Sequence, residues 1–363
     1  MATAALNVFG LVMGVVSLIP LAEQMIPDTS YLDTVVTIGV GGGDDKADTK
    51  DDRPGIRLFD EYGRDIGERR GNNYKTLKDG TTSDPNRNVI KIKASEKIGS
   101  KQATYISVSK GGDDALCISY ISVKWPDKGT QMWTGDIGYQ CGGHWYPSNT
   151  IVAGTNSYKS KCTWIDGNAS NGITTQGMGI HLIDFVANKF TAEAFAQNQS
   201  LLCDSKPRFH LYDYLTSDYY LPVFDPPLQY DDNHVDLDPE KVLVPGKAQG
   251  KQPPENKKDR RKRAQLAKRN TFPGKLVTSV QPAHSAKELC ESDMSFGPDF
   301  VSYHEGLFCD MSEKQLWPVC QEASETGCFD NDTRTMRAPS LSGRDVQSGP
   351  PVPTKDYHSI EDW

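Results

Sequence analysis

The sequence of 363 residues lacks the short motifs that mark the common catalytic sites. It contains no nucleophile elbow of the G-x-S-x-G type, no phosphate-binding P-loop and no glycine-rich dinucleotide fingerprint. His304 and Glu305 begin like the zinc-protease motif H-E-x-x-H, but the second histidine is missing. We therefore predict no catalytic residue and expect a protein that is not an enzyme.

Cysteine pairs at C-x-x-C spacing are also missing, which argues against a zinc ribbon or a redox motif. The eight cysteines fall into two sets of four along the sequence: Cys117, Cys141, Cys162 and Cys203, then Cys290, Cys309, Cys320 and Cys328. Each set of four can pair completely within itself. Asn168, Asn198 and Asn331 begin N-glycosylation acceptor tripeptides. Together these features favour disulfide bonds and predict a secreted glycoprotein, extracellular or in a cell wall.

Charge is unevenly distributed along the chain. Between Lys247 and Lys275 there are eleven Lys and Arg residues and two acidic ones, so this segment carries +9 and the rest of the chain −17. An acidic body repels phosphate backbones, so we expect no nucleic-acid partner. The dibasic pairs that end at Arg263 and Arg269 are candidate cleavage sites for a processing protease. The alternatives are that the basic segment is a nuclear localisation signal or a plain solvated linker.

Long apolar runs are limited to one, from Ala5 to Ala22, which contains no charged residue. Its length is borderline for a membrane span, which needs about 20 apolar residues. We interpret residues 1–22 as a signal peptide, with a retained membrane anchor and a buried amphipathic helix as alternatives. A membrane is expected as a partner only if this segment is retained.

Short runs of alternating apolar residues dominate residues 31–205, separated by turns rich in Gly, Asp and Asn. The longest run, Leu116 to Trp125, is apolar on both faces, as in a strand buried on both sides. This pattern predicts a mainly β fold, with an antiparallel β-sandwich or jelly-roll-like domain over residues 31–205.

The remaining chain is predicted to form three parts. Residues 206–285 are rich in Pro and basic residues and are interpreted as a linker, although the aromatic stretch from His210 to Phe224 is expected to pack back on the sandwich. Residues 286–337 are a small cysteine-rich lobe, which two disulfides would hold together. Residues 338–363 are predicted to be a disordered tail.

Aromatic residues gather around a Cys-Gly-Gly-His-Trp-Tyr sequence that begins at Cys141. Such rings can stack on sugars or anchor a protein partner. The candidate binding residues are Trp133, His144, Trp145, Tyr146 and Trp164. The alternative is that the tryptophans fill the core and that the glycines form a tight turn.

Two further readings concern polar residues. His144 or His181 with a nearby carboxylate could act in hydrolysis, although a structural histidine is the simpler interpretation. Acidic clusters around Asp44, Asp113 and Asp231 could bind calcium, but their spacing matches no EF-hand, and solvated turns are favoured. We therefore assign no metal site and no cofactor, with calcium as the alternative.

Several stretches resemble a group of uncharacterised proteins from filamentous ascomycete fungi. These stretches are VTIGVGGGDDKADT, IRLFDEYGRDIG, DDALCISYISVKWPDKGTQMWTGDIGYQCGGHWY, GPDFVSYHEGLFCDMSEKQLWPVC and GCFD. The resemblance covers about Val35 to Arg337 and implies fungal origin and secretion, but no activity. The succession of short strands in residues 31–205 is also similar to that of C2/PLAT-type sandwiches. This is an analogy at the level of the fold alone.

From these observations we expect an extracellular binding or effector-like protein that recognises a glycan or a protein surface. A secreted hydrolase that uses a His/carboxylate site is one alternative. A membrane-associated or self-assembling structural protein that uses residues 1–22 is the other.

Overall fold

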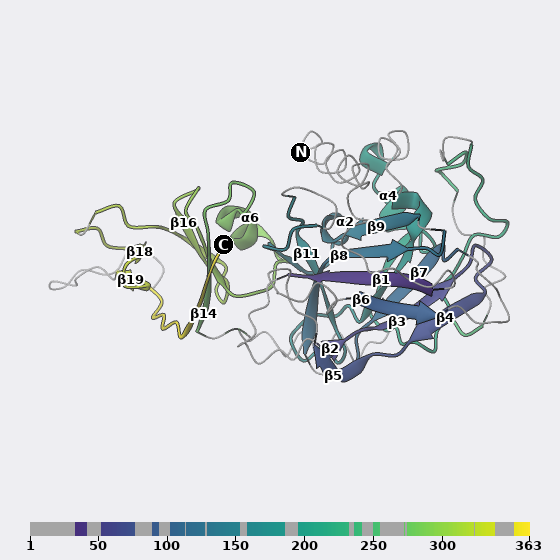
Figure 1. The fold of residues 1–363 in the computed structure, drawn as a ribbon. Coiled ribbons are helices and arrows are strands. Elements are labelled where there is room, and N and C mark those ends of the chain that lie inside the picture. The colour runs from purple at the N-terminus through teal and green to yellow at the C-terminus, as the bar shows by residue number, and fades with distance from the viewer. Residues whose placement is uncertain are drawn as a thin grey trace. The chain divides into compact units, whose positions relative to one another are not determined.

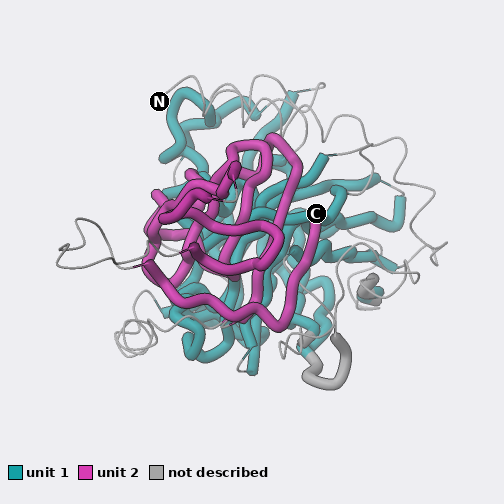
Figure 2. Tube along the Cα trace, turned by 90° about the vertical axis from the view of Figure 1, so that its left-hand side faces the viewer, with its two compact units in different colours: residues 1–268 teal, residues 269–363 magenta. Residues whose placement is uncertain are grey.

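A computed structural model describes fourteen parts of the chain: residues 33–41, 52–76, 89–93, 102–112, 114–127, 129–152, 158–185, 195–231, 236–241, 250–254, 272, 274–322, 324–337 and 352–363. The chain divides into two compact units, residues 1–268 (unit 1) and 269–363 (unit 2), which are coloured separately in Figure 2. The predicted signal segment and the dibasic pairs at Arg263 and Arg269 lie outside the described residues. Within the described parts, no helix is long and apolar enough to cross a membrane.

Unit 1 is built on two antiparallel sheets (Figure 1). The first has the order β10-β11-β8-β1-β6, with β9 also paired to β8. Its strands are β1 (Asp33–Val40), β6 (Val89–Lys93), β8 (Ala115–Lys124), β9 (Thr130–Thr134), β10 (Trp145–Tyr146) and β11 (Cys162–Asp166). The second has the order β13-β12-β7-β3-β4. Its strands are β3 (Gly55–Phe59), β4 (Asp65–Arg69), β7 (Tyr105–Ser109), β12 (Gly177–His181) and β13 (Phe209–Tyr212).

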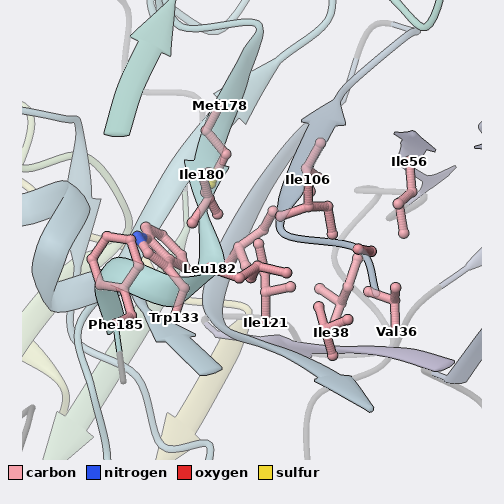
Figure 3. Close-up of a cluster of buried hydrophobic side chains, with 14 of the residues drawn as sticks. Val36, Ile38, Ile56, Ile106, Ile121, Trp133, Met178, Ile180, Leu182 and Phe185 are labelled. Atoms are coloured by element: carbon pink, nitrogen blue, oxygen red, sulfur yellow. The ribbon is translucent and has the colours of Figure 1, made fainter. Parts of the chain in front are cut away.

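One hydrophobic cluster joins the two sheets face to face. Figure 3 shows side chains of the first sheet (Val36, Ile38, Ile121) packed with those of the second (Ile106, Met178, Ile180). Short elements complete the unit: the strand pair β2 (Asp52–Arg53) and β5 (Asn72–Thr76), and the helices α2 (Gly135–Gln140), η2 (Leu182–Phe185) and α4 (Ser200–Cys203). The prediction of a mainly β fold with antiparallel sheets and disulfides is confirmed.

The sequence of strand β8 is apolar on both faces because both faces of the strand are buried. All ten of its residues are buried. Opposite β1 the register shifts between Ile118 and Tyr120, so that β8 carries one extra residue there, as at a β-bulge. The bulge changes the alternation of side chains, which places both Ile118 and Ile121 in the core between the sheets. Tyr120 instead packs with Met132 and Val152.

The segment that follows β13 covers the other face of the second sheet. Leu215, Tyr219, Leu221 and Val223 pack against Phe59 and Tyr105 in a separate hydrophobic cluster. The expectation that residues 210–224 pack back on the sandwich is therefore confirmed. A linker that begins at residue 206 is wrong, because β13 and this cover belong to the body of unit 1.

Unit 2 contains a five-stranded sheet of order β17-β16-β15-β14-β20. Its strands are β14 (Lys275–Ser279), β15 (Asp299–Ser302), β16 (Leu307–Asp310), β17 (Gln315–Pro318) and β20 (Ser359–Asp362). The hairpin of β18 (Cys328–Asp330) and β19 (Thr335–Arg337) and the helix α6 (Ala286–Glu291) complete it. Its core contains Leu276, Val301, Phe308 and Phe329.

The predicted boundaries of this lobe, 286 and 337, are too narrow. Strand β14 lies in the predicted linker, and β20 lies in the predicted disordered tail. Both β15 and β20 pair with β14 in parallel. Parallel partners are joined by long crossovers rather than tight turns, so no local turn signal in the sequence announces them.

Every cysteine is paired, and each disulfide closes within one unit. Unit 1 holds Cys117–Cys162 and Cys141–Cys203, and unit 2 holds Cys290–Cys309 and Cys320–Cys328. The complete pairing within each set of four, which the sequence allows, is thus confirmed. Four disulfides are typical of proteins that mature in an oxidising compartment.

The loops that these disulfides close set their expected effects on stability. Cys117–Cys162 spans 45 residues and Cys320–Cys328 only 8. Loop-closure entropy then predicts losses of about 4 and about 2.5 kcal/mol when the respective pair is replaced by serine. Denaturant unfolding of the two double variants measures both, and peptide mapping without reductant checks the pairing. Equal losses, or different pairs, would contradict the prediction.

Candidate functional site

The aromatic residues predicted to form a binding face lie inside unit 1. Trp133 and Tyr146 are fully buried, and Trp145 and Trp164 are nearly so. Trp133 stacks on Phe209 in the core between the sheets. The prediction of an exposed recognition face is wrong for these four residues, and the alternative, that the tryptophans fill the interior, is confirmed.

The surroundings of Trp145 show why its burial is stable. The edge of its ring meets Tyr139 of α2, with ring centroids 4.9 Å apart. The Lys161 ammonium lies 5.2 Å from the Trp145 ring centroid, within cation–π range. His144, the remaining candidate of this group, is half-buried. These side chains therefore stabilise the sheet rather than present a ligand-binding surface.

The three candidate glycosylation sites differ in exposure. Asn198 is exposed in the turn before α4, whereas Asn168 and Asn331 are half-buried. The Asn198 Oδ1 accepts hydrogen bonds from the backbone N–H and the hydroxyl of Ser200. The Asn331 Oδ1 accepts from Tyr303 and Arg334. Asn198 is therefore the most accessible acceptor of the three.

A buried charged network lies at one end of the second sheet of unit 1. The Arg208 guanidinium, which is fully buried, pairs with Asp184 at 2.5 Å and with Asp236 at 2.8 Å. The other oxygen of Asp184 lies 2.8 Å from His181 Nδ1, and Glu61 lies 3.1 Å from His181 Nε2. Four segments far apart in the sequence are thus joined by ion pairs.

The charges of this network hold His181 in its protonated form. Burial alone would lower the pKa of this imidazole, but the carboxylates of Asp184 and Glu61 outweigh burial and raise it to about 9. Tyr105 stacks on the His181 ring, with centroids 4.2 Å apart, and burial raises the pKa of its phenol. The cluster is therefore a set of compensated buried charges.

The hydrolase alternative needs a histidine that is paired with a carboxylate and accessible to a substrate, and His181 meets only the first requirement. Two carboxylates lie within hydrogen-bond reach of its ring, but the side chain has no exposed surface. A base that no substrate can reach cannot take part in hydrolysis. We therefore assign His181 to the structure of unit 1. Sequence reasoning named His181, and named Asp236 only as part of an acidic cluster. It missed Glu61 and Arg208, because their separations in the chain give no local signal.

A polar hollow on the surface of unit 2 is the better candidate for a binding site. Its volume is about 390 Å³, within the range of small-molecule sites. It is lined by Tyr303, Gly306, Val319, Cys320, Gln321, Glu322, Asp330, Asn331, Asp332 and Arg337. Among these, Gln321, Glu322 and Asp332 are exposed at the rim. None of these residues was predicted as a binding residue, although Asn331 and Cys320 were named for other reasons.

The walls of the hollow are held by a disulfide and by ionic contacts. Arg337 donates two hydrogen bonds to one oxygen of Asp330, at 2.7 and 2.6 Å, and a third to the Glu322 carbonyl. The Tyr303 hydroxyl lies 2.5 Å from Asn331 Oδ1. The Cys320–Cys328 bridge closes the loop that carries Gln321 and Glu322. The hollow is thus a preformed feature of unit 2.

Metal ligands do not assemble at either place. Among the described residues, no group of three or more His, Cys, Asp or Glu side chains is arranged to hold a metal ion. The candidate calcium residues Asp44 and Asp113 lie outside the described residues. Of the third acidic cluster, Asp236 is engaged by Arg208.

Replacement of Trp145 by alanine is expected to destabilise unit 1 by about 3–5 kcal/mol, because it removes a large buried ring and leaves a cavity. Denaturant unfolding gives the value. Tyr62→Ala is the matched control, since Tyr62 is 57% exposed in the same unit and should cost about 0.5 kcal/mol or less. A Trp145→Ala loss as small as that of the control would contradict the burial of this ring.

His181 is expected to make the stability of unit 1 depend on pH. Because its folded pKa is raised from 6.5 to about 9, its contribution is complete below pH 6.5 and is lost as pH rises through 9. The difference in the free energy of unfolding amounts to about 3 kcal/mol. The charged or titratable groups around His181 are Asp184, Glu61, Tyr105 and Arg208.

The measurement compares wild-type protein with His181→Gln between pH 6 and pH 10. The wild type should lose stability over this range relative to the variant. His304→Gln, an exposed histidine of unit 2, should behave as wild type. Parallel curves for wild type and His181→Gln would disprove the ionic role of this residue.

No protein-family model, no curated protein and no solved structure matches the chain. The resemblance to uncharacterised fungal proteins therefore stays a prediction.

Proposed function

We propose that the protein is an extracellular, effector-like binding protein and that its recognition site is the polar hollow of unit 2. The observation that carries this proposal is the combination in one preformed hollow of an aromatic ring with exposed amide and carboxylate side chains. Such a combination suits a hydroxyl-rich ligand, for which a glycan is the natural class.

The chemistry of the rim supports a glycan over an apolar ligand. The Gln321 amide can both donate and accept hydrogen bonds, and the carboxylates of Glu322 and Asp332 accept them from hydroxyl groups. Tyr303 contributes the only aromatic ring of the lining, and ring faces stack on the apolar face of a sugar. The site thus offers both kinds of contact that a sugar uses.

The extracellular setting is supported by the covalent structure. Four disulfides, with no free cysteine, are typical of secreted proteins. The exposed acceptor Asn198 fits glycosylation on the secretory route. Secretion and glycosylation are tested together by mass analysis of protein released from its own host.

Binding of the full-length protein to a glycan array tests the proposal. A ligand found there should bind about tenfold more weakly after Gln321→Ala or Asp332→Ala, because each change removes one hydrogen-bonding side chain. Glu313→Ala is the matched control, since Glu313 is an exposed carboxylate of the same unit outside the hollow. Binding that survives both rim substitutions, or an array without any ligand, would reject the hollow as a glycan site.

A further inference from the structure

Residues 352–363 form an extended segment that is seated along one edge of unit 2. Its strand β20 pairs in parallel with β14, with Ile360 opposite Leu276 and Asp362 opposite Thr278. Further backbone hydrogen bonds run from His358 to the Gly274 carbonyl and from Trp363 to the Thr278 carbonyl. The segment thus occupies the edge of β14 as an added strand, a common mode of peptide recognition.

A lysine socket lies beside this edge. Asp299 of β15 and Asp310 of β16 are both nearly fully buried, and the Lys355 ammonium lies between them at 2.9 and 2.7 Å. The Tyr357 hydroxyl also donates to Asp299, at 2.7 Å. Two buried carboxylates that share one ammonium need that charge, because without it both would be uncompensated. The pair is therefore specific for a cationic side chain at this position of the bound segment.

The shape of the edge fits the segment at both ends. Gly274 has φ of +72°, and a Cβ on it would lie 2.2 Å from the His358 ring, so the absent side chain makes room for that residue. At the other end the Trp363 ring packs against His284 and Phe300. Lys275 also pairs with Glu361, at 3.1 Å. The edge of β14 and the Asp299–Asp310 pair are hereafter called the strand groove.

We propose that the strand groove is a peptide-binding site that takes residues 352–363 of a second copy of this chain when its own segment is displaced. The groove recognises this segment by strand pairing, by the lysine in the carboxylate socket and by the aromatic residue at the far end. These features select an extended peptide of the same sequence, and a second copy supplies it.

The stretch of chain between β19 and residues 352–363 is long enough for such an exchange. Fourteen residues, 338–351, join Arg337 to the segment and lie outside the described residues. A chain of that length spans up to about 46 Å when extended. Within one molecule the attached segment has an effective concentration of about millimolar, so exchange needs a weakened resident segment.

Two full-length variants with complementary defects test the proposal. Lys355→Glu spoils the segment and leaves the groove intact, and Gly274→Ala spoils the groove and leaves the segment intact. Each variant alone should be monomeric by light scattering, whereas an equimolar mixture should form a one-to-one pair. The pair should disappear when the Gly274→Ala chain also carries Lys355→Glu. A mixture that stays monomeric, or a pair that persists in the double variant, would overturn the proposal.

A second measurement covers the case in which Lys355→Glu impairs folding. Lys355→Met keeps the apolar stem and removes the charge, and Lys287→Glu is the control for an exposed lysine of the same unit. A labelled peptide of residues 352–363 should bind Lys355→Met protein, and a peptide with glutamate at the lysine position should bind roughly 100-fold more weakly. Equal affinity of the two peptides, or no binding of either, would show that the groove does not select this segment.

Discussion

One cation between two buried carboxylates holds distant parts of the chain together in each unit. In unit 1, Arg208 lies between Asp184 and Asp236, and in unit 2, Lys355 lies between Asp299 and Asp310. Removing water from such charges is costly, so each carboxylate requires the cation, and the cation requires both carboxylates. This constraint ties Arg208 to η2 and to the segment around Asp236 in unit 1, and it ties residues 352–363 to β15 and β16 in unit 2.

Burial of the charges distinguishes the network of unit 1, which has a structural role, from the two proposed binding sites of unit 2. In unit 1 the charged groups pair with one another around His181, whose side chain has no exposed surface that a substrate could reach. In unit 2 the hollow keeps exposed polar side chains at its rim, and the strand groove holds residues 352–363, which end in the edge strand β20. Both proposed recognition sites therefore lie in unit 2, whereas unit 1 is a disulfide-crosslinked sandwich.

The sequence predicted those features that depend on local patterns. Alternation of apolar residues located the sandwich strands, and the even division of the cysteines anticipated the pairing within each unit. Sequence reasoning failed where partners are distant: β20 joins β14 across about eighty residues, and Arg208 meets Asp184 and Asp236 from separate segments. It also misplaced Trp145, because a ring that can stack on a sugar can equally fill a core.

The most direct test of the shared constraint compares a single with a triple substitution in unit 2. Lys355→Met alone leaves two buried carboxylates facing each other and should cost about 3–5 kcal/mol of unfolding free energy. The triple variant Lys355→Met, Asp299→Asn, Asp310→Asn removes all three charges and should recover most of that loss. A single substitution that costs less than about 1 kcal/mol, or a triple variant less stable than the single one, would contradict the account.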